Sequence, residues 1–490
     1  MKHLLFFCFY MPTILFANNK LQYNIYYNNA LEKEGLKIEV SYTHNSPQDS
    51  TVLYLVNRSW GEQNLLNTII LNKSENNGYN CYKIPDKFKL VFQHPKSKTV
   101  KLTYRIRQDY DNNDYNIFHR PRVQNEYFQI LGHSFFAVPF HLAGGYDNPL
   151  LNITINWIGF PGSFKIHNSF GTQQTTQKLK IHLWDELYHS AFFGGDYRIY
   201  NFKVQNYPVY FAIRGQWLNG FTDSLLLHNL QTSIQAQRDF WKDYKTRYYT
   251  IIMSPTVTSS DSSFKGHSNT GSGLANGYII QASNNLFNSL NTYKYLLYHE
   301  MMHDWIGGKI KNKYETLNYW FSEGFTDYYT YKNRLRSGDL LFNEWLESFN
   351  NEVIKAHFKN PNKNISNYIL KDSFWLSRKI EKVPYRRGAL FAFWIDNQIM
   401  LKSNYTKSLD DLMRDILHEC TIKNQKFTDE LFLTAVEKYL EKDISYFFQK
   451  HILTGVDIDF KNEQWIEGFR FDIQDGIPVL KTDTKPRYIL

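Results

Sequence analysis

The stretch of sequence that decides the fold reads His299-Glu300-Met301-Met302-His303. Around it, residues 287–310 contain no proline and repeat apolar residues at helical spacing, which predicts a helix. Two histidines four positions apart lie about 40° apart around a helix axis, so both imidazoles can reach one metal ion. Glu300 lies between them, where a carboxylate can act on a water molecule bound to that ion. The pattern indicates a zinc site with His299 and His303 as ligands and Glu300 as a general base.

A tetrahedral catalytic zinc needs a third protein ligand and one open position. Residues 320–329 follow a short polar connector and are predicted to form a second amphipathic helix, on which Glu323 is the natural third ligand. Asp327 lies one turn further along the same face, where it could accept a hydrogen bond from the free N–H of a ligand histidine. Glu315, in the connector, is a rival third ligand. The alternative interpretation is that Glu323 and Asp327 are solvated helix residues.

These residues also carry a resemblance to a known group of proteins. A His-Glu-x-x-His segment followed by Trp320-Phe321-Ser322-Glu323-Gly324-Phe325 resembles the gluzincin metallopeptidases, and within them the aminopeptidase N and glycyl aminopeptidase families. Nineteen residues separate His303 from Glu323, one more than is usual in the aminopeptidase N family, and the extra residue is expected within 311–315. The resemblance covers residues 217–455. It implies a thermolysin-like domain that binds one zinc ion and a peptide or protein substrate.

A later segment, Val383-Pro384-Tyr385-Arg386-Arg387-Gly388, resembles the family segment in which a tyrosine precedes a basic residue and a glycine at the start of a helix. By this resemblance Tyr385 donates its hydroxyl to the tetrahedral oxyanion, whose charge appears only in the transition state. A packing tyrosine is the alternative. Arg386 and Arg387 are interpreted as solvated arginines, with binding of a substrate carboxylate as the alternative.

The segment before the zinc helix bears on specificity. Aminopeptidases of this group read the substrate's amino terminus with a glutamate there, and the matching stretch of this chain runs from Gly271 to Gly277. Ala275 stands where the acid would be, and a methyl group cannot pair with an ammonium group. Either another residue recognises a free amine or none is required. The backbone of this segment is still predicted to bind an extended peptide by strand addition. The predicted substrate-binding residues are Gly273, Leu274, Ala275 and Asn276.

The amino-terminal residues predict export. A basic start, an apolar run from Leu4 to Phe16 and a small residue at Ala17 are typical of a cleavable signal peptide over 1–17. A secreted or periplasmic protein is expected, with a retained anchor as the alternative. No other segment approaches the apolar length of a membrane span, so none is expected after signal removal. Cys81 and Cys420 then remain, either as a disulfide or as two separate thiols.

The rest of the chain predicts an α+β protein of several domains. Residues 18–215 are mostly extended, with clear alternation at 99–107, and are interpreted as an antiparallel β-sandwich or saddle domain. Residues 216–457 are mainly helical and form the expected catalytic domain, and 458–490 are expected to be a C-terminal tail. The predicted helices of the catalytic domain, besides the two described above, are 224–244, 338–356, 387–400 and 428–442.

Composition excludes one class of partner and leaves several functions open. The formal charge of +9 is spread along the 490 residues and forms no basic run with a nucleic-acid-binding motif, so nucleic acid is set aside. The preferred function is a secreted zinc-dependent peptidase, aminopeptidase-like. The alternatives are an endopeptidase using the same site, a catalytically silent binding protein that keeps its zinc, and hydrolysis of a non-peptide bond such as an epoxide. Glu300 argues against the silent protein, because a purely structural metal needs no general base. The oligomeric state is not predicted.

Overall fold

The structure is a computed structural model that describes residues 20–483 except 112–116, 144–147, 173–174, 219–220, 245–247 and 258–264. The predicted signal peptide, 1–17, lies outside the described residues. The chain divides into two compact units. The first comprises Met1–Asp109, Arg120–Ile166 and Gln173–Gly195, and the second comprises Tyr110–His119, His167–Thr172 and Asp196–Leu490.

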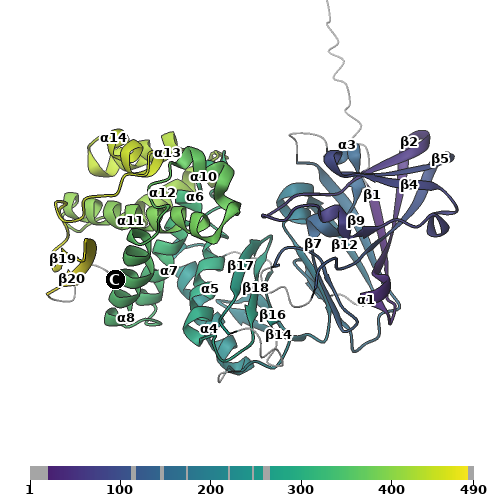
Figure 1. The fold of residues 1–490 in the computed structure, drawn as a ribbon, viewed down its shortest axis with the longest axis horizontal. Coiled ribbons are helices and arrows are strands. Elements are labelled where there is room, and N and C mark those ends of the chain that lie inside the picture. Colours follow the sequence, from purple (N-terminus) through teal and green to yellow (C-terminus); the bar gives the residue numbers. More distant parts are fainter. Residues whose placement is uncertain are drawn as a thin grey trace, which may run out of the picture. The chain divides into compact units, whose positions relative to one another are not determined.

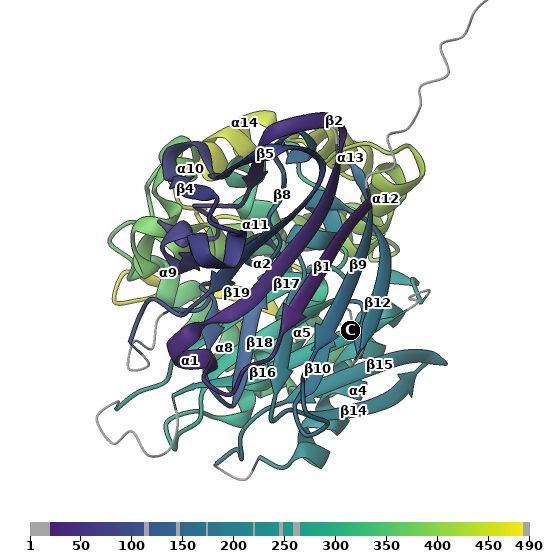
Figure 2. The same ribbon diagram turned by 90° about the vertical axis from the view of Figure 1, so that its right-hand side faces the viewer.

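The first unit is built on an eight-stranded sheet whose long strands run side by side in Figure 2. Their order is β12 (Thr176–His182), β9 (Leu150–Ile158), β1 (Lys20–Tyr26), β2 (Leu36–Tyr54), β5 (Lys89–Ile106) and β3 (Ile69–Ile70), with β4 (Asn80–Ile84) on β5 and β8 (Val138–Pro139) on β2. Every second residue of β9, from Leu151 to Trp157, is buried, as expected for a sheet with one covered face. The pairs are antiparallel except β1 with β9, which run parallel, a pairing that the antiparallel prediction missed.

Three further strands of this unit, β6 (Arg122–Val123), β7 (Tyr127–Leu131) and β13 (Ala191–Gly195), pair antiparallel. Its short helices are α1 (Leu31–Glu34), η1 (Leu65–Thr68), η2 (Lys73–Asn76), η3 (Pro85–Lys87), α2 (Gly132–Phe135), α3 (Phe140–Ala143) and η4 (Leu183–Tyr188). The chain passes to the second unit within the hairpin of β10 (Lys165–Asn168) and β11 (Gly171–Thr172).

A five-stranded sheet begins the second unit. Its order is β14 (Arg198–Val204), β15 (Tyr207–Ile213), β16 (Tyr249–Val257), β18 (Gly277–Ser283) and β17 (Asn269–Leu274). β15, β16 and β18 are parallel, whereas β14 and β17 are antiparallel to their neighbours. Helices α4 (Asp223–Trp241) and α5 (Leu290–Met302) lie beside this sheet in Figure 1. The predicted boundary after residue 215 lies twenty residues beyond the observed one, because β14 and β15 belong to the five-stranded sheet of the second unit instead of joining the first unit.

Helices make up most of the remaining chain, shown green to yellow in Figure 1. They are η5 (Glu315–Leu317), α6 (Tyr319–Ser322), α7 (Gly324–Arg336), α8 (Phe342–Ser348), η6 (Phe349–Lys355), α9 (Ala356–Phe358), α10 (Asn367–Ser373), η7 (Phe374–Leu376), α11 (Arg378–Lys402), α12 (Leu409–Ile422), α13 (Asp429–Leu440), α14 (Ser445–Phe448) and η8 (Gln449–Leu453). Among the described residues, no helix is both long and apolar enough to span a bilayer. Cys81 in β4 and Cys420 in α12 are free thiols.

Two predictions about this region need correction. Helix α11 begins at Arg378, nine residues before the predicted start, and contains Pro384. Ser377 caps it by accepting a hydrogen bond from the Ile380 N–H, and proline in the second turn removes only one backbone hydrogen bond. The expected tail is instead a hairpin, β19 (Phe469–Gln474) with β20 (Ile477–Thr482), whose Leu480 exchanges backbone hydrogen bonds with the Asn350 side chain.

A buried charge cluster joins α7, α11 and α12. The Lys332 ammonium lies 2.5 Å from Asp396 and 3.0 Å from Asp410, and the Lys332 and Asp396 side chains are 4% and 1% exposed. Arg336 pairs with the other oxygen of Asp410, and Tyr328 donates to Asp396. Burial alone would raise the pKa of Asp410, but Lys332 and Arg336 outweigh it and lower that pKa to about 2. The two carboxylates therefore depend on their cations.

Replacing Lys332 by methionine leaves two buried carboxylates short of positive charge. We expect the Lys332→Met variant to lose about 3–5 kcal/mol of unfolding free energy in urea. Lys438→Met removes an exposed ion pair with Asp415, at 3.1 Å, and serves as the matched control with a loss of about 1 kcal/mol or less. Equal stability of the two variants would contradict this account of the cluster.

Candidate metal centre and active site

Helix α5 carries His299 in its last turn and His303 at its C-terminal end. Ser289 caps the helix by accepting a hydrogen bond from the Thr292 N–H, and Tyr293, Leu297 and Met301 are buried along one side. The helix ends at Met302, so His303 is its C-terminal cap residue. This short helix places both imidazoles on one side, as their spacing predicts.

Three ligand atoms converge at this point. The Nε2 atoms of His299 and His303 are 3.3 Å apart, and Glu323 Oε2 lies 3.5 Å from the first and 3.7 Å from the second. Glu323 occupies the junction of α6 and α7, and its N–H donates to the Tyr319 carbonyl one turn earlier. In the part of the chain that the structure describes, these three residues are the only group of histidine, cysteine or acidic side chains with such spacing.

The geometry and charge of this group fit a zinc ion. Nitrogen and oxygen ligands about 2.0–2.1 Å from one ion at tetrahedral angles lie about 3.3–3.4 Å apart. Glu323 Oε2 is buried, and its close polar neighbours are the two Nε2 atoms at 3.5 and 3.7 Å. Burial tends to lower the pKa of His299, but hydrogen bonds to Asp327 and Glu323 outweigh it and raise that pKa to about 10. Positive charge is thus strongly favoured between these side chains.

The other nitrogen of each histidine is held by the protein. His299 Nδ1 lies 2.9 Å from Asp327 Oδ1, and His303 Nδ1 lies 3.2 Å from the Ile306 carbonyl. Such contacts fix the tautomer that leaves Nε2 free for a metal. Tyr295 also donates its hydroxyl to Asp327 and stacks on the His299 ring. Tyr295 is not among the predicted site residues, although it precedes His299 by one helical turn and this spacing is the signal that identifies it.

Glu300 is held between α5 and strand β17. Its side chain is buried, and this burial raises its pKa, an effect that His299 and His303 partly oppose. The close neighbour is Gly271, because a Cβ atom added there would lie 2.2 Å from the Glu300 carboxyl group. A Cβ at Gly273 would lie 3.0 Å from that of His303. The two glycines therefore let the strand backbone approach the helix.

Tyr385 lies beside the ligand group. Its ring stacks on the His299 ring with 5.9 Å between centroids and 8° between planes. Burial, and next the charge of Glu323, raise the pKa of Tyr385 well above its usual value, so the hydroxyl stays protonated. Within the described chain that hydroxyl makes no hydrogen bond to the protein, and the side chain is only partly buried. A free, protonated donor thus lies next to a metal ligand.

The structure decides between the alternatives for three charged residues. Glu315 is not a member of the ligand group, since its oxygens accept hydrogen bonds from Ser322 and Asn312. Arg387 is buried and donates to the carbonyls of Lys363, Ile365 and Ile452, so the expected solvation of this residue is wrong. Arg386 donates to the Ala356 carbonyl.

The predicted substrate segment divides into strand and turn. Gly273 and Leu274 end β17, the edge strand of the sheet as described. Ala275 and Asn276 form the two-residue turn to β18, with Asn276 at a φ of 59°, a conformation that asparagine tolerates. Only the strand residues can therefore extend a ladder to a bound peptide.

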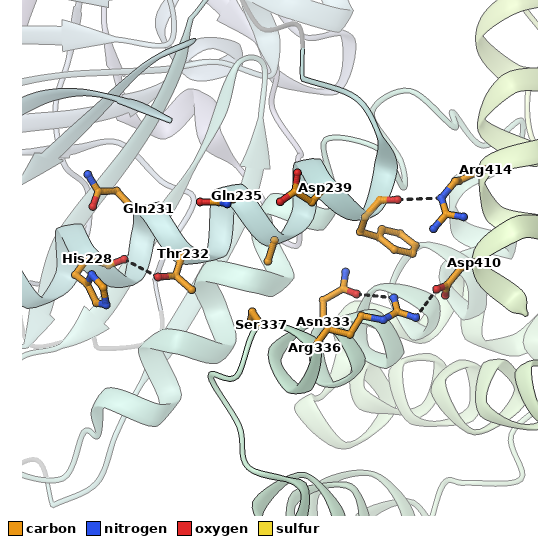
Figure 3. Close-up of a pocket in the computed structure, with 12 residues that line it drawn as sticks. His228, Gln231, Thr232, Gln235, Asp239, Asn333, Arg336, Ser337, Asp410 and Arg414 are labelled. Atoms are coloured by element: carbon orange, nitrogen blue, oxygen red, sulfur yellow. Dashed lines mark hydrogen bonds and ion pairs between the residues drawn. The ribbon is translucent and has the colours of Figure 1, made fainter. Parts of the chain in front are cut away.

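A separate cavity of about 700 Å³ lies between α4, α7 and α12, away from the ligand group. Figure 3 shows Arg336 between Asn333 and Asp410, while Arg414 donates to the Phe240 carbonyl at 3.0 Å. The arginines of this cavity are thus engaged by acceptors of the protein itself.

Comparison with solved structures shows the fold of this chain, whereas comparison of its sequence finds no matching family. No family model and no curated protein matches the sequence. An aminopeptidase N family protein from Idiomarina loihiensis matches 93% of this chain and 79% of its own, with a TM-score of 0.73 and 17% identity. An M1 zinc metallopeptidase from Deinococcus radiodurans matches 90% of this chain and 94% of its own, with a TM-score of 0.53 and 13% identity. The chain has the fold of the M1 peptidases, and the predicted fold class, a β-rich part followed by a mainly helical part, is confirmed.

The contact between Gly271 and Glu300 gives a prediction. Gly271→Ala requires the strand or the carboxylate to move, so we expect peptide hydrolysis to fall at least about tenfold while zinc content stays near that of the parent. Gly273→Ala is the matched variant. Its added Cβ would lie 3.0 Å from the His303 Cβ, a less severe contact than that at Gly271, so it should lose less activity. The ranking of the two rates is the measurement, and a larger loss in Gly273→Ala would contradict the assigned geometry.

Proposed function

We propose that this protein is a zinc-dependent peptidase that hydrolyses peptide bonds and acts as an aminopeptidase. The observation that carries the proposal is the triangle of His299, His303 and Glu323, with ligand atoms 3.3–3.7 Å apart and Glu300 beside it. A structural zinc site is usually closed by four protein ligands, whereas a catalytic site keeps one position open. Three ligands next to a buried general base favour catalysis over a silent binding role.

His299, His303 and Glu323 would hold the zinc ion, which would lower the pKa of a bound water and polarise the substrate carbonyl. Glu300 accepts the proton of the attacking water and delivers it to the leaving amine, and its raised pKa suits both steps. Tyr385 donates its hydroxyl to the carbonyl oxygen as negative charge develops there. Asp327 holds the His299 ring in place throughout. The edge strand β17 binds the backbone of the substrate.

The fold neighbours support peptides as the substrate class. One structure of a mutant Deinococcus radiodurans M1 enzyme is bound to the substrate Tyr-Ser-Ala, and it matches 90% of this chain at a TM-score of 0.51 and 14% identity. Another is bound to L-tryptophan.

Glu315 is the residue best placed to replace the acid missing at Ala275. The residue is exposed at the surface, although burial of its carboxyl group raises the pKa. It lies within electrostatic reach of Glu323 and His303, and it forms no ion pair with any described basic residue. Ser322 and Asn312 hold its two oxygens at 2.9 and 2.7 Å. A carboxylate without a basic partner beside the ligands favours a substrate with a free ammonium group. We further propose that the protein acts after export, supported by the sequence of residues 1–17.

Glu300→Gln tests the general base. The amide keeps the size of the side chain but cannot take up a proton, so kcat should fall by about 10²- to 10⁴-fold with zinc content unchanged. Glu347→Gln, on the exposed surface of α8, is the control and should retain the parent rate. An unchanged rate in Glu300→Gln would falsify the mechanism.

A peptide library supplied with free and with acetylated amino termini tests the aminopeptidase assignment. We expect cleavage of the free pool alone, at the first peptide bond, with mass spectrometry as the readout. Cleavage of both pools would mean an endopeptidase. If neither pool is cut faster than by Glu300→Gln, the silent binding protein or a non-peptide substrate becomes the better account.

A further inference from the structure

A lysine ammonium lies at the edge of the ligand group, in a place that the chemistry above does not use. Lys382 precedes Tyr385 by one turn of α11, and its Nζ lies 3.5 Å from the centre of the Tyr385 ring. That ring in turn stacks on His299. A single aromatic ring therefore connects this cation to a metal ligand.

Local acids compensate this cation only in part. Glu381 is 3.8 Å from Lys382 but also contacts Arg378, so one carboxylate serves two cations. Glu323 and Asp327 act at longer range, and both already contact His299. Burial, followed by the charge of Arg378, lowers the pKa of Lys382, and the charges of Glu381, Asp327 and Glu323 oppose this effect.

The Lys382 side chain is nevertheless not fully enclosed by the protein. The Lys382 side chain keeps 23% of its surface exposed, and no described residue takes a hydrogen bond from it. An ammonium group has three N–H donors, which normally form hydrogen bonds with acceptor atoms or with water. A hydrogen-bond acceptor of a substrate beside Tyr385 could bind these N–H groups. The charge there would be screened less than in bulk water.

We propose that Lys382 binds a carboxylate of the peptide substrate next to the scissile bond and so selects acidic substrates. The inference rests on the proposed peptidase function and adds the chemistry of the substrate to it. Two sources can supply the group: an aspartate or glutamate side chain, or the terminal carboxylate of a very short peptide. Either source would place a carboxylate group beside the Lys382 ammonium.

Binding to zinc-loaded Glu300→Gln protein tests this without relying on turnover. Two peptide pairs with free amino termini separate the sources. Ala-Glu-Ala amide against Ala-Gln-Ala amide reports the side-chain carboxylate, and Ala-Ala free acid against Ala-Ala amide reports the terminal carboxylate. We expect the acidic member of one pair to bind about tenfold tighter by calorimetry, which identifies the source.

Three further substitutions in this background assign the effect to one side chain. Lys382→Met should abolish the tenfold preference, whereas Lys382→Arg, which keeps the charge, should retain most of it. Lys379→Met removes an exposed lysine of the same helix and should leave the preference intact. Equal binding within both pairs, or a preference that survives Lys382→Met, would overturn the role of Lys382 but leave the peptidase proposal standing. Absence of binding by all four peptides would contradict both.

Discussion

The close contact of two helices at Gly324 and Gly388 is the constraint on which the site depends. A Cβ atom on Gly388 would lie 1.9 Å from the Trp320 carbonyl oxygen, and one on Gly324 would lie 2.4 Å from the Gly388 Cα atom. Since Glu323 directly precedes Gly324 and Tyr385 lies three residues before Gly388, one crossing positions both the proposed third ligand and the proposed oxyanion donor. Larger residues at this crossing would separate the two groups.

Charge explains why these side chains remain together in a buried setting. Burial tends to raise the pKa of Glu323, but His303 and His299 outweigh it and lower that pKa to about 2. The same group of acids raises the pKa of His299. Without a metal the site favours a proton on His299, so a metal ion competes with a proton for this position. The fold therefore gathers negative charge at this point that a divalent cation would neutralise.

The sequence predicted the parts of the site that obey local spacing and missed those set by long-range packing. His299, His303, Glu323 and Asp327 could be placed because each is one or a few helical turns from another. The start of α11 was predicted nine residues too late because the resemblance placed Tyr385 at the start of a helix, and Lys382 lies in the missed segment. β14 and β15 were assigned to the wrong unit, and the parallel pairing of β1 with β9 was missed. The sequence of a strand does not identify the strand with which it pairs. The tight approach of Gly271 to Glu300 also depends on tertiary packing.

Zinc K-edge X-ray absorption on the purified protein is the most direct test of the central claim that His299, His303 and Glu323 hold one zinc ion. The account predicts one zinc per chain with a first shell of nitrogen and oxygen alone at about 2.0–2.1 Å, and loss of that zinc in Glu323→Ala. A sulfur shell at about 2.3 Å, which would implicate Cys81 or Cys420, or zinc retained in full by Glu323→Ala, would contradict it.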